Sequence, residues 1–245
     1  MARPLLLAGG LIGIGLAACA TVPPAPRVDY AAILADPIRP DADRARDADR
    51  KPAELVAFAG VKPSDKVAEL APGGGYFTRI LSGVVGPQGR IYAMTSKPSA
   101  ALEALAQARP NVAVTVAPPG TIPAPEPVDM VWTTLNYHDF KNVRFDSGDG
   151  AAALNAAAFR ALKPGGIYFI VDHEAGPGVG ASVTSTLHRI EGALVKREVE
   201  AAGFRLEAES PLLRHPADDH SQKVQETGIR GKTDQFVLRF RKPRR

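Results

Sequence analysis

The sequence predicts an α/β domain in which helices cover both faces of a mostly parallel β-sheet. From Lys66 onward, short apolar segments typical of strands alternate with segments of helical periodicity. A glycine-rich turn at residues 72–75 joins the first strand to the next helix, and residues 167–171 form an unbroken apolar run. Such a run fits a strand that is buried on both faces of a sheet. This alternation favours parallel strands with crossover helices, so ligands should bind beyond the carboxyl ends of the strands.

The first 18 residues are interpreted as a signal peptide that is not part of the fold. Arg3 precedes an apolar run at residues 5–18, which is shorter than the ~20 residues of a membrane span. The run leads into Leu-Ala-Ala-Cys at residues 16–19, which resembles the lipobox of bacterial lipoproteins. The resemblance implies that Cys19 is lipidated and anchors an exported protein on the periplasmic side of a bacterial membrane. The alternative is a chance cysteine at the end of an ordinary signal peptide.

Residues 19–51 are predicted to be a tether followed by a charged arm. Residues 22–26 are rich in proline and therefore extended, whereas acidic and basic side chains alternate over residues 36–51. A helical stretch is expected near residues 42–50. The arm is interpreted either as a solvated, salt-bridged surface or as a lid over a site. Residues 52–245 are predicted to form one domain, for which their number suffices.

Composition argues against a nucleic-acid partner. The formal net charge is only +4, and 23% of the residues are charged. The one dense basic run, at residues 239–245, is interpreted as a solvated tail, with a weak attraction to anionic lipid headgroups as the alternative. The single cysteine excludes an internal disulfide and a thiolate metal site. The oligomeric state is left unpredicted.

The elements of the domain follow from periodicity and from helix-breaking residues. Pro52 opens a helix that Gly60 ends, because proline suits the first helical turn and glycine the C-terminus. Helices are predicted at residues 53–59, 76–85, 98–108, 151–162 and 190–202. Strands are predicted at residues 67–70, 90–95, 112–116, 128–132, 167–171, 205–209 and 235–241. Residues 133–150 are predicted to be a polar loop.

Residues 69–75, Glu-Leu-Ala-Pro-Gly-Gly-Gly, combine an acidic strand residue with a glycine-rich entry to a helix. Glycines let a backbone approach a ligand closely, and a helix N-terminus offers free N–H groups. The segment resembles the first motif of class I S-adenosylmethionine (SAM) methyltransferases, acidic-x-Gly-x-Gly-x-Gly, with Ala71 at the first glycine. The resemblance implies that the acidic residue helps to hold the methionine amino group of SAM. The residues that it implies for cofactor binding in this turn are Glu69, Ala71, Gly73, Gly74 and Gly75.

The resemblance extends over roughly residues 52–242. Residues 128–132 look like the fourth strand of these enzymes, and residues 161–168 look like their Leu-Lys-Pro-Gly-Gly entry to the fifth. The resemblance implies a doubly wound, Rossmann-like sheet of seven strands, mostly parallel with an antiparallel last strand, and SAM as the cofactor. More narrowly, the chain resembles a group of exported bacterial proteins described as predicted methyltransferases, in residues 50–54, 135–139 and 229–236.

The second strand departs from this pattern at its end. Class I methyltransferases usually have Asp or Glu there to grip the ribose hydroxyls, whereas residues 94–96 are Met-Thr-Ser. The hydroxyl of Thr95 can make a neutral hydrogen bond, which is weaker than a bond to a carboxylate. We therefore expect weak or altered SAM binding. An exported protein also lacks an obvious supply of SAM, which is made inside the cell.

Candidate catalytic residues follow the fourth and fifth strands. Asn136, His138 and Asp139 follow the fourth strand, where methyltransferases place substrate and catalytic groups. His138 suits a general base because histidine titrates near neutral pH, and Asp139 is a second candidate. Asn136 is predicted to contact the cofactor, and His173, after the fifth strand, is a third catalytic candidate. Backbone hydrogen bonding and capping remain the alternative roles.

The remaining histidines have weaker signals. His188 is interpreted as a capping or packing residue, and His220 as part of a solvated loop. All five histidines lie between residues 138 and 220, and with Asp139 and Asp172 they could in principle form a mixed nitrogen and oxygen metal site. No pair has a diagnostic spacing, so no metal ligand is predicted.

Three functional hypotheses follow. The first is SAM-dependent methyl transfer to an unknown small or cell-envelope molecule. The second is a non-catalytic, ligand-binding envelope lipoprotein that keeps the methyltransferase fold. The third is a metal-dependent envelope enzyme that uses the histidines and aspartates at the strand ends.

Overall fold

The computed structural model describes residues 28–146 and 148–244. The predicted signal peptide at residues 1–18, the predicted lipidation site Cys19 and the proline-rich tether lie outside the described residues. Among the helices of the described residues, none combines the length and the apolar character needed to cross a membrane.

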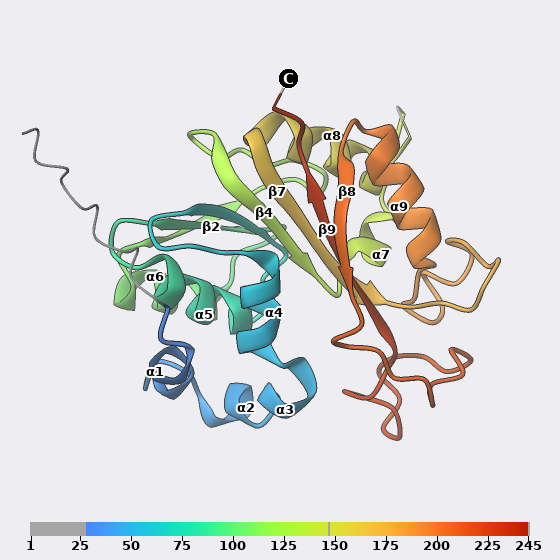
Figure 1. Ribbon diagram of the computed structural model, residues 1–245, viewed down its shortest axis with the longest axis horizontal. Coiled ribbons are helices and arrows are strands. Elements are labelled where there is room, and N and C mark those ends of the chain that lie inside the picture. The colour runs from blue at the N-terminus through green and yellow to red at the C-terminus, as the bar shows by residue number, and fades with distance from the viewer. Residues whose placement is uncertain (1–27, 147, 245) are drawn as a thin grey trace, which may run out of the picture.

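A seven-stranded sheet forms the centre of the molecule (Figure 1). Its strand order is β3-β2-β1-β4-β7-β9-β8, and β9 runs antiparallel to both of its neighbours while the other pairs are parallel. The strands are β1 Lys66–Leu70, β2 Arg90–Thr95, β3 Val112–Val116, β4 Val128–Thr134, β7 Leu162–His173, β8 Arg205–Ser210 and β9 Gln235–Arg241. The predicted fold class, a doubly wound and mostly parallel sheet with an antiparallel last strand, is confirmed.

Helices cover both faces of this sheet (Figure 1). The helices of the domain are α4 Pro52–Ala59, α5 Tyr76–Val85, α6 Ala100–Ala108, α8 Gly150–Ala161 and α9 Gly192–Ala201. On the face of α4 and α5, the core includes Trp132 and Phe169. On the face of α8 and α9, it includes Tyr168 and Phe240. Tyr168 and Phe169 belong to opposite cores because successive side chains of a strand point to opposite faces.

The glycine-rich turn directs β1 into α5. Gly75 precedes the helix in the left-handed conformation, with φ +86°. A Cβ atom at Gly75 would lie 3.2 Å from the side chains of both Leu102 and Leu105 on α6. Glycine is therefore required here both by the backbone conformation and by the close packing of α6 against the turn.

Residues 133–150, predicted to be a loop, contain more structure than expected. They include the end of β4, the short helix α7 Tyr137–Phe140 and a hairpin of β5 Arg144–Phe145 and β6 Gly148–Asp149. The Asp172 carboxylate accepts a hydrogen bond from the backbone N–H of His138 at 2.7 Å, which supports the first turn of α7. The loop prediction was wrong because this contact comes from a distant strand and leaves no local signal.

The charged arm packs against the domain. It forms three short helices, α1 Tyr30–Ala35, α2 Asp41–Arg44 and α3 Asp47–Arg50. Arg39 is only 2% exposed and pairs with Asp47, which also accepts a hydrogen bond of 2.6 Å from the Tyr76 hydroxyl on α5. Arg79 of α5 pairs with Asp43 at 2.9 Å. These contacts bury Arg39 and half-bury Asp43 and Asp47, whereas Asp41, Arg46 and Asp49 remain exposed. The arm is therefore a salt-bridged surface that packs on α5 with its inner side and meets solvent with its outer side.

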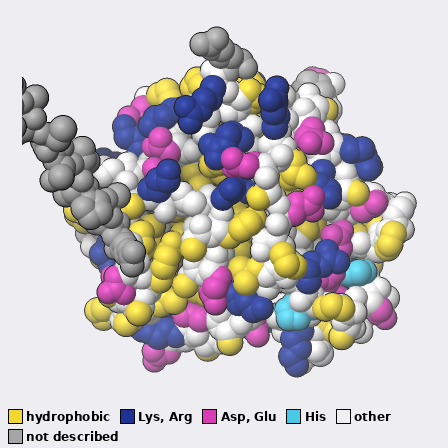
Figure 2. Space-filling model, in the orientation of Figure 1, with side chains coloured by type: hydrophobic (Ala, Val, Ile, Leu, Met, Phe, Trp, Pro, Cys, Tyr) yellow, Lys and Arg dark blue, Asp and Glu magenta, His cyan; other side chains and the backbone are white. Residues whose placement is uncertain are grey.

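Acidic and basic side chains are interspersed over the face of the molecule drawn in Figure 2. The formal net charge of +4 is therefore not gathered into one broad basic patch on this face.

Candidate functional site

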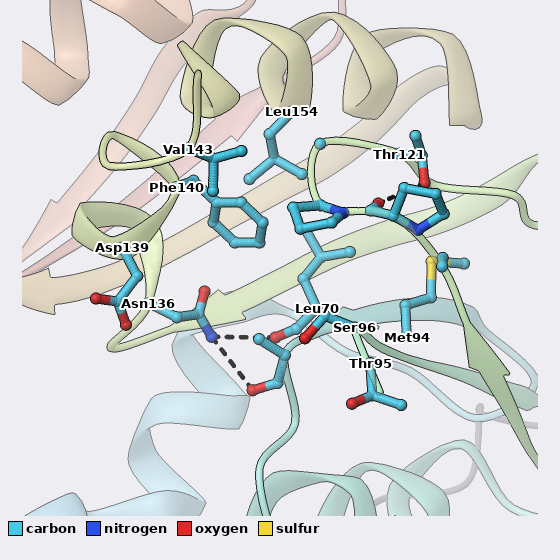
Figure 3. Close-up of a pocket in the computed structure, with 15 residues that line it drawn as sticks. Leu70, Met94, Thr95, Ser96, Thr121, Asn136, Asp139, Phe140, Val143 and Leu154 are labelled. Carbon is cyan, nitrogen blue, oxygen red and sulfur yellow. Dashed lines mark hydrogen bonds between the residues drawn. The ribbon is translucent and has the colours of Figure 1, made fainter. Parts of the chain in front are cut away.

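A cavity of about 260 Å³ lies at the carboxyl ends of β1, β2 and β3 (Figure 3). The strand order reverses between β1 and β4, and open α/β sheets bind ligands at such a switch point. The walls come from the ends of β1 and β2, the loop after β3, and the segment that includes α7. The lining residues that the argument uses below are Ala71, Met94, Thr95, Asn136, Asp139 and Phe140.

Asn136 connects two walls of this cavity. Its side-chain amide donates to the carbonyl oxygens of Leu70 at 3.1 Å and Ala71 at 3.3 Å, and to that of Thr134 at 3.1 Å. Figure 3 shows the amide pointing from α7 toward the end of β1. Asn136 thus holds β4 and β1 together at the switch point, in addition to lining the cavity.

The residues predicted to bind the cofactor lie in different surroundings in the structure: some line the cavity, some are exposed and some are buried. Ala71, Thr95 and Asn136 line the cavity. Gly73 and Gly74 are exposed, and a Cβ atom at either would meet nothing within 4 Å. Gly75 is buried against α6 and shapes the turn from behind.

Glu69 does not line the cavity. Its side chain is 2% exposed, and its Oε2 atom has no hydrogen-bond partner among the described residues. Burial raises the pKa of Glu69 to about 7, against the smaller opposing effects of Thr78 and Arg79. The carboxyl group thus lies on the α5 side of β1, away from the position that the resemblance implies for it.

The end of β2 carries no carboxylate. The Thr95 hydroxyl donates to the carbonyl oxygen of Lys97 at 3.0 Å, although Thr95 remains part of the cavity wall. Among the residues lining this cavity, Asp139 is the one charged side chain. A ligand in the cavity therefore meets mainly apolar walls and neutral polar groups.

A cluster of histidine and aspartate side chains adjoins the cavity at α7. His138 is buried, and its Nδ1 atom lies 2.7 Å from Oδ1 of the fully buried Asp172. Its Nε2 atom lies 3.2 Å from Nδ1 of His188 and 3.3 Å from Oδ1 of Asp139. The structure thus brings His138, Asp139 and Asp172 together as their positions at strand ends indicated, and it adds His188.

The charges around His138 dominate its ionisation. Burial alone lowers the pKa of His138, but the charge of Asp172 and the contacts with Asp139 outweigh burial and raise the pKa to about 10. His173 behaves differently, because burial lowers the pKa of His173 to about 4. His173 is 6.1 Å from His138 between ring centroids, and its Nδ1 atom lies 2.8 Å from the Thr233 hydroxyl.

A second cavity of about 390 Å³ lies beside His173, at the end of β7, and carries three arginines. Arg46, Arg50, His173 and Arg230 are among its lining residues. The guanidinium of Arg50 lies 4.5 Å from the ring centroid of Tyr76, the first residue of α5. Burial, reinforced by the charge of Arg46, lowers the pKa of Arg50 to about 10.

Sequence reasoning missed two parts of this site. His188 was assigned to capping or packing, because nothing in its local sequence connects it with residue 138. The arginines of the second cavity were not proposed as site residues, although residues 50–54 and 229–236 carry the narrower resemblance. His220 lies 3.2 Å from Asp234, and it does not join the cluster.

The fold is that of SAM-dependent methyltransferases. The chain is similar to a SAM-dependent methyltransferase from Aquifex aeolicus, with 18% identity, a TM-score of 0.60, and coverage of 88% of this chain and 100% of that one. It is also similar to the [4+2]-cyclase SpnF, with 16% identity, a TM-score of 0.59, and coverage of 80% and 81%. Aeropyrum pernix fibrillarin, solved with natively bound SAM, matches with 18% identity, a TM-score of 0.51, and coverage of 80% and 76%.

No family model matches the sequence, and no curated protein matches it either. The similarity to solved structures, at identities below 20%, therefore defines the fold of the chain.

Proposed function

We propose that this protein is a SAM-dependent methyltransferase that acts on a small or cell-envelope acceptor. The observation that carries the proposal is the cavity at the carboxyl ends of β1, β2 and β3, beside a glycine turn with open space around it. This cavity lies at the switch point of the sheet, where ligands of such folds bind. The open space at Gly73 and Gly74 leaves room for a ligand to approach the backbone.

Different residues would hold the two ends of SAM. Met94, Thr95 and Phe140 offer apolar walls and one hydroxyl for the adenosyl end. The turn at Gly73 and Gly74 suits the methionine end, and Arg50, which stacks over the start of α5, suits its carboxylate. When bound, SAM supplies an activated methyl group.

The acceptor is expected to bind beside Asp139. The Asp139 side chain is 54% exposed and lines the edge of the cavity, so it can accept a hydrogen bond from an acceptor and orient it. Positioning of two reactants accounts for a large part of catalysis in displacement reactions. The three arginines of the second cavity favour a methyl acceptor that carries negative charge, whether it binds there or passes through on its way to Asp139.

Isothermal titration with SAM and with its demethylated product, S-adenosylhomocysteine, tests cofactor binding. The wild-type chain should bind both, and Gly74→Val should weaken binding at least 10-fold because a branched side chain enters the open space beside the turn. Gly228→Val is a matched control, since a Cβ atom at Gly228 also meets nothing within 4 Å and lies in a different loop. Absence of heat with either ligand, or equal affinity of the wild type and Gly74→Val, would contradict the proposal.

The second hypothesis, a binding protein without turnover, keeps one specific observation in its favour. Thr95 replaces the carboxylate expected at the end of β2. Incubation with methyl-labelled SAM and a cell-envelope extract separates the two hypotheses: transfer of the label supports the enzyme, whereas tight binding without transfer supports the binding protein.

We also propose that the protein is exported and anchored to a membrane through lipid on Cys19. The support is the resemblance of residues 16–19 to a lipobox and the apolar run before them. Cys19→Ser should move the protein from the membrane fraction to the soluble fraction of cells. Retention of the variant in the membrane fraction would contradict the lipid anchor.

A further inference from the structure

Three donor atoms beside the first cavity form a nearly equilateral triangle. His138 Nε2 lies 3.2 Å from His188 Nδ1 and 3.3 Å from Asp139 Oδ1. The remaining side, from His188 Nδ1 to Asp139 Oδ1, is also 3.3 Å. Within the described part of the chain, these three residues are the one group of His, Cys, Asp and Glu side chains whose ligand atoms converge in this way.

The size of this triangle matches a small divalent ion. Zinc binds histidine nitrogen and carboxylate oxygen at about 2.0–2.2 Å, so tetrahedral ligands stand about 3.3–3.6 Å apart. The two sides of 3.3 Å lie at the short end of this range, and the side of 3.2 Å lies just below it. Two histidines and one carboxylate are also a ligand set that leaves a coordination position open, as catalytic zinc sites do.

Asp172 orients the His138 ring for metal binding through Nε2. The Asp172 carboxylate, fully buried, lies 2.7 Å from His138 Nδ1 and is therefore placed to accept its proton in a hydrogen bond. The second proton of His138, on Nε2, is displaced when a metal ion binds, and the lone pair that this exposes faces His188 and Asp139. Metal-binding histidines usually have such a carboxylate or carbonyl partner, which fixes the tautomer and the ring orientation.

The backbone at His188 is held in an uncommon conformation. Its φ is +55°, which residues other than glycine adopt uncommonly, and the next residue, Arg189, is fully buried. Strained backbone persists where the surrounding structure enforces it, and it is frequent at ligand sites. The ring nitrogen of His188 is thereby brought to the two donors of α7.

We propose that His138 Nε2, His188 Nδ1 and Asp139 bind a divalent metal ion of the zinc class. The site has an outer face, since the side chains of Asp139 and His188 are 54% and 26% exposed. Asp139 also lines the first cavity, so the open coordination position adjoins that cavity. If the proposed methyltransferase function holds, this ion binds an oxygen of the acceptor and orients it beside the methyl donor.

Metal binding is tested on the untagged, full-length protein with Zn²⁺ and with Co²⁺. Titration calorimetry should show one equivalent of Zn²⁺, and Co²⁺ should give the visible absorption bands of a site with nitrogen and oxygen ligands. His188→Ala and Asp139→Asn should each weaken Zn²⁺ binding at least 100-fold. Asp172→Asn replaces the carboxylate that contacts both the ring and the backbone N–H of His138, so it should weaken Zn²⁺ binding 10- to 100-fold and alter the Co²⁺ spectrum.

His220→Ala is the matched control. His220 also contacts a carboxylate, that of Asp234 at 3.2 Å, but it is outside the triangle, so its loss should leave Zn²⁺ affinity unchanged. Circular dichroism of each variant shows whether the fold is retained. Lack of stoichiometric Zn²⁺ binding, or equal affinity of the wild type and a folded His188→Ala, would overturn the metal site.

Titration with S-adenosylhomocysteine separates this inference from the proposed function. Binding of the nucleoside without binding of metal overturns the metal site and leaves the methyltransferase proposal standing. Binding of metal without binding of the nucleoside supports the metal site and contradicts the methyltransferase proposal. That outcome favours the hypothesis of a metal-dependent enzyme.

Discussion

At the scale of single residues, Thr95 and the histidine cluster decide what the site can bind. Thr95 lies at the end of β2, in the wall of the first cavity, and its hydroxyl donates to a backbone carbonyl 3.0 Å away. It therefore offers a ligand one neutral oxygen where a carboxylate would offer two charged ones. Asp139, on the opposite wall, supplies charge instead, at the place where an acceptor would lie.

Thr95→Asp should tighten binding of S-adenosylhomocysteine. Hydrogen bonds to charged groups contribute about 1 kcal/mol more than neutral ones, which corresponds to roughly a 5-fold gain in affinity. Calorimetric titration of the variant and the wild type measures the change. Thr186→Asp is the control, because Thr186 is exposed and its hydroxyl also donates to a local carbonyl, that of Val183. Unchanged or weaker binding in Thr95→Asp would place the ribose hydroxyls elsewhere.

At the scale of elements, the charged arm and α7 owe their positions to contacts with distant segments. Short helices such as α2 and α3, of four residues each, are not stable alone and depend on tertiary contacts. Asp47 provides one, since it pairs with the buried Arg39 and accepts a hydrogen bond from Tyr76 on α5. The arm thereby brings Arg46 and Arg50 to the second cavity.

Asp47→Ala should destabilise the protein by about 3 kcal/mol, because it leaves a buried guanidinium without its partner. The side chain of Arg39 is fully buried, and after the substitution it keeps the neutral carbonyl oxygen of Leu34, 2.8 Å from Nη1, but loses its charged partner. Urea unfolding of the two proteins measures the difference. Asp41→Ala, at an exposed position of α2, is the control and should change stability by less than about 0.5 kcal/mol. A similar loss in both variants would show that Asp47 has no special role.

At the scale of the whole molecule, the sheet order brings segments that are far apart in sequence to one edge. β1 and β4 are neighbours, and so the ends of β1, β2 and β4 form one cavity. β1 is also central in the sheet, which buries Glu69 completely. Because Glu69 is buried only in the folded protein, the pH at which its carboxyl group ionises affects the free energy of unfolding.

Glu69→Gln should stabilise the protein at alkaline pH and not in acid. In the unfolded chain the pKa of a glutamate is near 4.3, whereas burial raises the pKa of Glu69 to about 7 in the folded protein. The folded state holds the proton more tightly, so wild-type stability falls as pH rises from about 4 to about 7 and is then constant. The gain from Glu69→Gln should thus grow over this range and reach about 3 kcal/mol above pH 7.

Urea unfolding at pH 4, 6 and 8 measures this gain. Glu54→Gln, on the exposed side of α4, controls for the loss of one carboxylate. A gain for Glu69→Gln that is equal at pH 4 and pH 8 would show that the folded protein does not raise the pKa of Glu69.

The sequence by itself determined the order and type of the main elements and the place of the ligand turn. Helical and strand periodicities are local properties, and the conformations that Gly75 and Pro52 favour are local as well, so the seven strands and the principal helices were predictable. The candidates Ala71, Asn136 and Asp139 follow from strand ends in a parallel sheet, and all three line the cavity.

Only the tertiary structure decided which side chains meet. His188 joins His138 across 50 positions of sequence, Asp172 supports α7 from another strand, and Glu69 turns away from the cavity into the α5 side of the sheet. Arg50 reaches the second cavity because the arm docks on α5. Such contacts depend on the strand order and on loop paths, which periodicity does not encode, because periodicity reports only which face of its own element a residue occupies.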